Sequence, residues 1–261
     1  MEQTAEKNNV WNAIMYLIIY SVAGFLIETT FGIVTKGVIE SRKSFLYGPF
    51  CAIYGIGALA MILILRNQKS IGKLFIYGCV IGAFVEYMMS YLCEVFFNVK
   101  WWDYSGELLN INGRTCLFYA VSWGILAIVL IKFVNPYVDK FIEFFRQKNN
   151  FFKTFAILLI AFYSIDAILT GYTLKVFYYR IVAENNISTE NQYQIAIKYG
   201  DIKKNNKFAS FINSYYNDEI MLKTYPNMMI SLKNNNDVYI ESLVDGIKPY
   251  YYRLGEAFSL E

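Results

Sequence analysis

The sequence predicts an all-α polytopic membrane protein with about five transmembrane helices and a small, mostly helical C-terminal tail. Its composition is 56% hydrophobic and only 17% charged, whereas a soluble domain has roughly 45–50% apolar and about 25% charged residues. Apolar runs of helical length recur up to about residue 174. After residue 180 the chain becomes rich in asparagine and charge, and no uncharged run there is long enough to cross a bilayer.

The first span is expected over about residues 10–34. Residues 10–27 carry no charge, and at about 1.5 Å per residue they nearly cover the hydrocarbon core of a bilayer. This run is too long for the apolar region of a signal peptide, which has about 7–15 residues. We therefore expect it to remain in the protein as a helix, with Glu28 toward its far end.

The second and third spans are expected over about residues 48–65 and 74–97. The motif G-P-F opens the second span, because a proline in the first turn of a helix replaces an N–H that has no partner there. The third span contains Glu86 and Glu94. Glu86 lies near the middle of its helix, where an ionisable side chain is costly and indicates function.

The fourth and fifth spans are expected over about residues 115–131 and 154–174. An aromatic loop, W-W-D-Y-S, precedes the fourth span, which is expected to start at the motif N-G-R. Asn135-Pro136 is predicted to break this helix, and residues 138–146 then read as an amphipathic helix on the membrane surface. The fifth span contains Asp166.

These spans divide the chain into two predicted domains. Residues 1–180 form the transmembrane bundle, and residues 181–261 form the polar C-terminal tail. The tail has too many apolar residues for plain disorder, so we expect a small, mostly helical unit. A turn is predicted at Tyr225-Pro226-Asn227, because proline and asparagine favour turns.

The composition also excludes several classes of function. The chain has no histidine, which removes the commonest general base and zinc ligand and every Ser-His or Cys-His nucleophile. The four cysteines lie in apolar segments without C-x-x-C spacing, as expected for buried small hydrophobes and not for a metal site. The net charge of +3 gives no basic surface for nucleic acid. We therefore expect no enzyme activity, cofactor, metal site or nucleic-acid partner.

The polar residues of the spans are predicted to gather on one side of the membrane. Odd-numbered spans all exit on that side, so the ends that carry Glu28, Glu94 and Asp166 lie there. The second and fourth spans start there. The alternative is that these acids only snorkel to the interface or cap helix ends, but Glu86 is too deep for that explanation.

Two short motifs suggest an internal repeat. Residues 24–28 and 82–86 share the pattern G-x-x-x-E, and residues 48–54 and 113–119 share G-x-x-C-x-x-Y. The two motifs occur in the same order in both copies, which predicts parallel two-helix repeats related by an axis along the membrane normal. Transporters often bind their substrate at such a repeat interface. Helix contact alone would explain the glycines, but not the acids.

A polar pocket follows from this arrangement. Two helix N-termini with unpaired N–H groups suit an anionic group, and Arg114 adds a bidentate guanidinium, although it could instead pair with Asp103 or Glu94. The loop aromatics are either interfacial anchors or a ligand cage. The deeper acids could bind a cation or carry a proton, because burial favours the neutral carboxyl. The candidate substrate-binding residues are Glu28, Gly48, Pro49, Tyr54, Glu86, Glu94, Trp101, Trp102, Asp103, Tyr104, Asn112, Gly113 and Arg114.

Several of these motifs together resemble the ABC-transporter type IV (CmpB-like) family of bacterial membrane proteins. The resemblance rests on S-F-L-Y-G-P-F-C-A-I-Y-G-I-G at residues 44–57, the W-W-D-Y-S and N-I-N-G-R pair, the acids of the third span, and M-L-K-T-Y-P-N-M at residues 221–228. The family usually has proline where Ala52 stands, and we find no E-A-A coupling loop that would dock an ATPase.

The resemblance implies a permease or small-solute transporter subunit, multi-pass in the plasma membrane. Its partners would be the lipid bilayer and a separate ATPase subunit or further copies of the chain. The alternative is a non-transporting scaffold or envelope sensor whose tail recruits a partner. A membrane enzyme that uses only carboxylates is a third reading, although no nucleophile or metal-ligand set is visible.

The topology can be tested by labelling. Single cysteines at Arg42, Trp102 and Lys175, each in a cysteine-free background, should all react from the same side with a membrane-impermeant reagent. This follows because the three positions lie in loops or helix ends on one predicted face. Labelling of any two from opposite sides would contradict the arrangement of spans.

Overall fold

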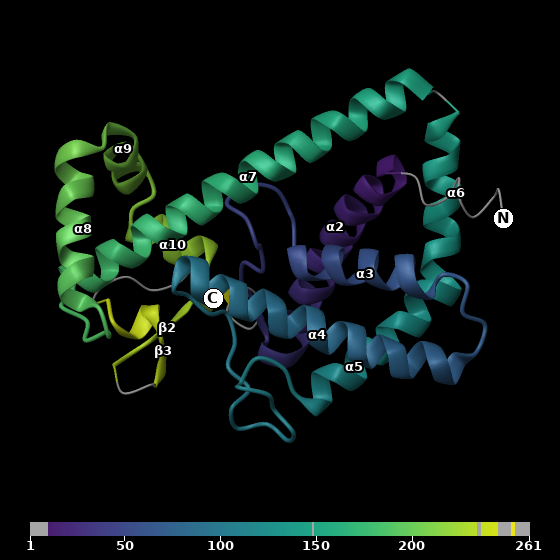
Figure 1. The fold of residues 1–261 in the computed structure, drawn as a ribbon, viewed down its shortest axis with the longest axis horizontal. Helices are drawn as coiled ribbons and strands as arrows, with labels where there is room; N and C mark the ends of the chain where they lie inside the picture. The colour runs from purple at the N-terminus through teal and green to yellow at the C-terminus, as the bar shows by residue number, and fades with distance from the viewer. Residues whose placement is uncertain (1–9, 148, 234–235, 245–251, 254–261) are drawn as a thin grey trace, which may run out of the picture. The chain divides into compact units, whose positions relative to one another are not determined.

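The computed structural model describes residues 10–147, 149–233, 236–244 and 252–253. They are mostly helical (Figure 1), as predicted. The chain forms two compact units: the first comprises residues 1–27, 47–89 and 104–166, and the second comprises residues 28–46, 90–103 and 167–261. The predicted boundary at residue 180 stays a prediction, and these units divide the chain differently.

Four helical stretches of the described chain are long and apolar enough to cross a membrane. Three of them are α2 (Val10–Lys36), α4 (Ile71–Phe97) and α7 (Asn149–Glu184). The fourth runs from Leu117 to Arg146. The predicted class, an all-α membrane protein, is therefore confirmed. The second predicted span corresponds to α3 (Ala52–Leu65), which has 14 residues. That is fewer than the roughly 20 of an ordinary span, so the count of five stays a prediction.

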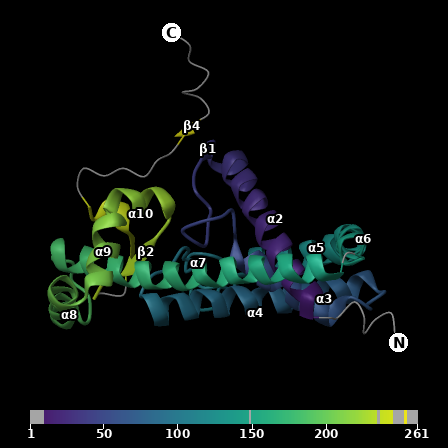
Figure 2. The same cartoon turned by 90° about the horizontal axis from the view of Figure 1, so that it is seen from above.

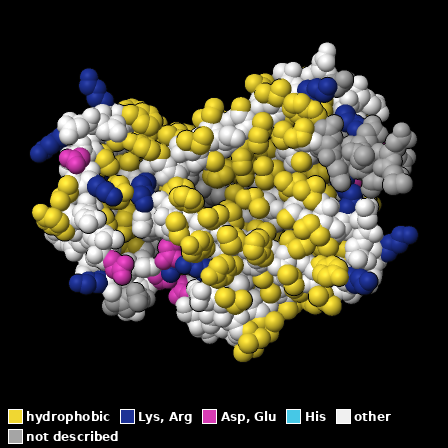
Figure 3. Space-filling view, in the orientation of Figure 1, with side chains coloured by type: hydrophobic (Ala, Val, Ile, Leu, Met, Phe, Trp, Pro, Cys, Tyr) yellow, Lys and Arg dark blue, Asp and Glu magenta, His cyan; other side chains and the backbone are white. Residues whose placement is uncertain are grey.

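The outer surface of these helices is apolar. On α4, Ile76, Val80 and Phe84 follow one another at steps of four residues, and each is more than half exposed. Figure 3 shows hydrophobic side chains spread widely over the visible face. A face of this kind would be unfavourable in water but suits contact with lipid chains.

Helices α3 and α5 (Leu117–Val129) begin later than the sequence suggested. Their N-caps are Cys51 and Cys116, so the predicted starts at Gly48-Pro49-Phe50 and at Asn112-Gly113-Arg114 are wrong. The reason is the backbone at the two glycines, where φ is +68° at Gly48 and +65° at Gly113. A left-handed residue cannot continue a right-handed helix, so both glycines turn the chain before the helix begins.

The break predicted at Asn135-Pro136 is also wrong. Helix α5 continues through η1 (Leu130–Val134), a π-helical turn, into α6 (Asn135–Arg146), with Pro136 in the first turn of α6. A π turn accommodates a proline because the wider turn re-pairs backbone groups that the missing N–H would otherwise leave unmatched. The stretch therefore bends at this point without being interrupted, and Figure 1 shows α6 running at an angle to α5.

Glycines and aromatic rings hold the helices of the first unit together. A Cβ on Gly24 of α2 would lie 2.3 Å from Cβ of Tyr54 on α3, and one on Gly82 of α4 would lie 2.1 Å from Cγ of Trp123 on α5. The rings of Tyr54 and Trp123 lie 5.3 Å apart between their centroids. We call this row of contacts the glycine–aromatic seam. It links four helices because the two glycines let a ring approach the helix backbone.

The two copies of the sequence repeat share local structure. In each G-x-x-C-x-x-Y motif the glycine has a positive φ and the cysteine is an extended N-cap. In each G-x-x-x-E motif the glycine lies against an aromatic side chain of the short helix that follows. The similarity of the motifs therefore reflects the same way of starting a helix and packing it.

The tail packs around the C-terminal end of α7. It consists of α8 (Gln192–Asn205), α9 (Lys207–Tyr215), α10 (Asp218–Thr224) and a hairpin of β2 (Met229–Ser231) and β3 (Asp237–Tyr239), followed by the short turn η2 (Ile240–Ser242). Figures 1 and 2 both show α8, α9 and α10 gathered at that end of α7. The predicted mostly helical tail is therefore confirmed, as is the turn, which falls at residues 226–227.

The core of the second unit includes residues from both α7 and the tail. Leu174, Phe177 and Ile181 of α7 are fully buried among Ile212 and Leu222 of the tail helices. The second unit also contains a short antiparallel pair, β1 (Val38–Ile39) with β4 (Tyr252–Arg253). The last turns of α7 are thus covered by protein and not by lipid.

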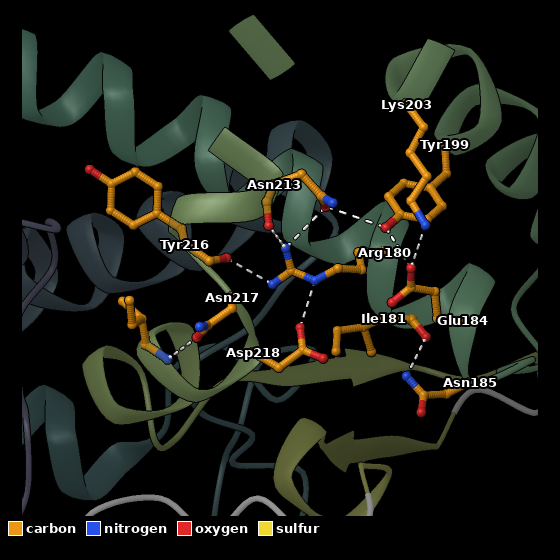
Figure 4. Close-up of polar contacts among 11 residues, drawn as sticks. Arg180, Ile181, Glu184, Asn185, Tyr199, Lys203, Asn213, Tyr216, Asn217 and Asp218 are labelled. Carbon is orange, nitrogen blue, oxygen red and sulfur yellow. Dashed lines mark hydrogen bonds and ion pairs between the residues drawn. The ribbon is translucent and has the colours of Figure 1, made fainter. Parts of the chain in front are cut away.

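Arg180 fixes the tail to α7 (Figure 4). Its Nε donates to Asp218 Oδ1 at 2.6 Å, its Nη1 to Asn213 at 2.9 Å (backbone O) and 3.0 Å (Oδ1), and its Nη2 to the carbonyl of Tyr216 at 2.9 Å. The guanidinium also lies 5.1 Å from the ring centroid of Phe177. A planar guanidinium with several donors suits such a site. We call this set of contacts the Arg180 clamp.

A second polar contact joins α8 to the end of α7. Burial raises the pKa of Tyr199, so its hydroxyl stays protonated and donates to Glu184 Oε1 at 2.7 Å. Lys203 Nζ donates to the same oxygen at 2.8 Å. Both contacts hold α8 against α7 at neutral pH.

The glycine–aromatic seam gives a stability prediction. Gly82→Ala should lower the free energy of unfolding by about 1–3 kcal/mol, because the new methyl group overlaps the base of the Trp123 side chain. The measurement is the melting temperature of purified protein in detergent. Gly72→Ala on the same helix is the matched control, since its Cβ meets only Ser70 Oγ at 4.0 Å. Equal melting temperatures for the two variants would contradict the seam.

Candidate functional site

Glu86 is the centre of the candidate site, and it lies on α4 within the first unit. Its residue surface is only 4% exposed. The hydroxyl of Thr115 donates to Glu86 Oε2 at 2.8 Å, and the hydroxyl of Tyr104 donates to Oε1 at 3.4 Å. The structure therefore supplies hydroxyl partners to a buried carboxyl group in an apolar helix, where an unpaired one would be costly.

The loop between α4 and α5 is folded so that both hydroxyls reach Glu86. The N–H of Tyr104 donates to the carbonyl of Gly113 at 2.8 Å, and the N–H of Gly113 donates to Asn110 Oδ1 at 3.2 Å. Ile111 and Thr115 form an isolated β-bridge. Asn112 and Gly113 both have positive φ, which asparagine and glycine tolerate best. The asparagines and the glycine of the N-I-N-G-R motif are therefore explained by this turn.

Tyr87, the neighbour of Glu86 on α4, connects the site to Arg114. Asn112 Nδ2 donates to the hydroxyl of Tyr87 at 3.1 Å. The guanidinium carbon of Arg114 lies 5.8 Å from the centroid of the Tyr87 ring, within the range of a cation–π contact. Arg114 is in the turn before α5 and not in the first turn of that helix. It is half-buried, so part of its side chain remains accessible.

Tyr104 is held on its other side by α5. Its ring stacks on that of Tyr119, with centroids 4.4 Å apart and planes 20° apart. The stacking fixes the phenol that reaches Glu86. Tyr104 thus acts as a positioned hydrogen-bond donor in this structure.

The remaining candidates of the first unit have packing positions. Tyr54 belongs to the glycine–aromatic seam, and Gly48 lies in the turn that precedes α3, where a Cβ would be 2.4 Å from the Phe50 ring. Pro49 is exposed in the same turn. The turn at Gly48 and the N-cap Cys51 therefore set the start of α3.

The other five candidates belong to the second unit: Glu28, Glu94, Trp101, Trp102 and Asp103. Glu94 lies 3.6 Å from Lys100 Nζ, which also contacts Asp237 at 2.8 Å. The ring of Trp101 meets that of Tyr225 edge to face at 6.3 Å. These contacts join the helix end of α4 to the tail. Glu28 and Trp102 are half-buried and Asp103 is exposed.

Asp166 has the structural role that the sequence left open. Both of its carboxylate oxygens accept from the N–H of Tyr47, at 3.1 and 3.2 Å. A buried carboxylate that accepts from a backbone N–H stabilises a loop start. The residue therefore fixes the chain just ahead of α3.

The sequence reasoning missed a polar network in the first unit. Asp139 Oδ1 accepts from the hydroxyl of Tyr16 at 2.5 Å, from Arg66 Nη2 at 3.2 Å and from Asn135 Nδ2 at 3.2 Å. Tyr20 donates to Asn135 Oδ1 at 3.0 Å. The signal was available as tyrosines four residues apart on the first span, which place two hydroxyls on one helix face.

An apolar groove is also present in the first unit. Its volume is about 650 Å³, and its walls come from α2, α6 and α7. Met15, Ile19, Val138 and Leu159 are among the lining residues. Because the groove is lined by apolar side chains, it suits an acyl chain and not an anionic group. The polar pocket expected from the sequence therefore stays a prediction.

The long apolar helices and the buried carboxyl group of α4 define a polytopic helical membrane protein. Residues 15–171 match the family described as "Putative ABC-transporter type IV", and the chain belongs to this family. The matched range contains Glu86, Thr115 and Arg114 and ends before the tail. No significant match was found among curated proteins or among solved structures.

The contact between Thr115 and Glu86 can be tested directly. Thr115→Val keeps the shape of the side chain but removes the hydroxyl that donates to Glu86, so the protein should lose about 1–3 kcal/mol of stability. Thr115→Ser keeps the donor and should lose less. The measurement is the melting temperature of the parent protein and of the two variants. A Thr115→Val variant as stable as the parent would contradict the hydrogen bond from Thr115 to Glu86.

Proposed function

We propose that the chain is a permease subunit for a small solute, multi-pass in the plasma membrane, and that Glu86 is its proton- or cation-binding group. The observation that carries the proposal is the burial of Glu86 against the hydroxyls of Thr115 and Tyr104. A hydroxyl can donate or accept a hydrogen bond. The same two partners can therefore stabilise Glu86 as a carboxylate and as a neutral acid.

This property suits a coupling residue. A carboxyl group that changes protonation inside a membrane needs partners for both states, because an unpaired polar group costs several kcal/mol there. Partners that rotate their hydroxyl hydrogens meet this need without moving a helix. Ionisable residues inside transporters commonly carry protons or ions for this reason.

Arg114 supports a solute with a carboxylate or phosphate group. Its guanidinium lies over the ring of Tyr87, which is next to Glu86 on α4. Arg114 is only half-buried, so part of its side chain is accessible. A planar fork binds a carboxylate or phosphate with two hydrogen bonds. In this proposal Arg114 attracts the solute and Glu86 carries the coupled proton or cation.

The proposal also assigns the partners. The sequence contains no G-x-x-x-x-G-K-[ST] phosphate loop, so in an ATP-driven system hydrolysis would come from a separate subunit. The alternative partner in this proposal is a further copy of the chain. We propose no reaction for the chain itself and so treat it as a membrane subunit and not as an enzyme.

The test uses Glu86→Gln in reconstituted protein. Native mass spectrometry first identifies a co-purifying anionic solute, and its uptake into proteoliposomes is then measured at two pH values. The glutamine keeps the shape and hydrogen bonding of the side chain, so melting should change little. Uptake should fall at least tenfold, and its dependence on pH should disappear.

Glu94→Gln is the matched control, because Glu94 is a carboxylate of the same helix that pairs with Lys100. It should retain uptake. Arg114→Lys keeps the charge but loses the planar fork, so it should weaken binding of the solute without removing the pH dependence. Full uptake by the Glu86→Gln protein at both pH values would overturn the proposal and favour the scaffold or sensor reading.

A further inference from the structure

We infer that one face of the tail binds the anionic surface of the lipid bilayer beside the point where α7 leaves the membrane. The face consists of the outward side of α9 and the lysines next to it, and we call it the α9 lipid face. Its members are Lys204, Lys207, Phe208, Phe211 and Tyr215. The inference does not depend on the proposed transport function.

The aromatic residues of α9 are largely exposed. Phe208, Phe211 and Tyr215 are 56%, 59% and 55% exposed, whereas Ala209 and Ile212 of the same helix are buried. The exposed residues follow at steps of three and four, so they share one side of the helix. The rings of Phe211 and Tyr215 also stack, with centroids 5.9 Å apart. A helix with one buried and one exposed apolar side needs a second apolar environment.

The position of α9 along α7 shows which environment this is. The rings of Phe208 and Tyr172 lie 5.4 Å apart, and Asn206 Nδ2 donates to the hydroxyl of Tyr172 at 3.4 Å. Between Lys153 and Lys175, α7 carries only one charge, Asp166. That stretch covers about 32 Å at ~1.5 Å per residue, close to the thickness of a bilayer core. Tyr172 therefore lies at the membrane interface, where tyrosine is enriched.

Because Tyr172 is at the interface, the start of α9 is there too. Both belong to the second unit, so their contact is fixed within that unit. An amphipathic helix in this position can place aromatic side chains among lipid headgroups and acyl chains. This continuity with a membrane-spanning helix distinguishes the face from an ordinary exposed apolar patch.

The charges around α9 complement anionic lipids. Residues 192–215 contain four lysines and one aspartate. Lys203 is engaged with Glu184, whereas Lys198, Lys204 and Lys207 are exposed. Figure 3 shows Lys and Arg side chains interspersed with hydrophobic ones on the visible part of the tail. Clustered lysines next to a membrane helix attract phosphatidylserine-type or other anionic headgroups.

The experiment places p-benzoylphenylalanine at position 211 of the full chain. The protein is irradiated in nanodiscs of either phosphatidylcholine alone or a mixture of about seven parts phosphatidylcholine and three parts phosphatidylglycerol. Mass spectrometry then measures the yield of the covalent lipid adduct. Position 210 is the matched control, since Ser210 is half-buried on the same helix and stands two residues after Phe208, one before Phe211 and five before Tyr215, off their side. Melting temperatures confirm that each protein is folded, and position 208 replaces 211 if the latter is destabilised.

The expected result is an adduct yield at position 211 at least fivefold above that at position 210. It should rise at least twofold when phosphatidylglycerol is present. Lys204→Gln with Lys207→Gln should reduce the yield to its value in phosphatidylcholine alone. Equal yields at the two positions, no effect of the anionic lipid, or crosslinks to a second copy of the chain in place of lipid would each overturn the inference.

Discussion

The energetic cost of a buried carboxyl group organises the first unit. Glu86 lies in an apolar helix at 4% exposure, so it needs hydrogen-bond partners that the helix itself does not provide. Thr115 and Tyr104 supply them from the loop after α4. For both to reach the same carboxyl group, the loop must turn back on itself through Asn112 and Gly113, which have positive φ. The conformation of the loop, the start of α5 and the position of Arg114 all follow from this requirement.

The class of the fold could be predicted from composition, and the depth of one acid, Glu86, indicated a buried carboxyl group that needs partners. Long apolar runs become helices, and an acid far from either end of such a run must be accommodated by something. The loop motif N-I-N-G-R predicts a helix start, whereas the structure has a turn there and the helix begins after Cys116. The sequence does not reveal whether a glycine near a helix start has a positive φ. Because Gly48 and Gly113 do, the helices begin only after the N-caps Cys51 and Cys116.

Other features depend on contacts between distant segments and gave weaker signals. Asp166 resembles Glu86 in sequence, as an acid within an apolar run, yet it binds the backbone of Tyr47, 119 residues away. Glu94 likewise pairs with Lys100, and Trp101 packs on Tyr225. Whether an intramembrane acid is a functional group or a structural acceptor depends on its partner, which helical periodicity does not specify. The bend before Pro136 could not be predicted either, because the π-helical turn there is set by which backbone groups pair and not by side-chain periodicity.

The Arg180 clamp couples movement of the end of α7 to movement of the tail. One continuous helix runs from Asn149 to Glu184, and its last turns are embedded in the tail through Arg180, Phe177 and Ile181. A piston-like shift or a rotation of α7 about its axis would therefore displace the tail core with it, because those side chains cannot slide past a close-packed interior.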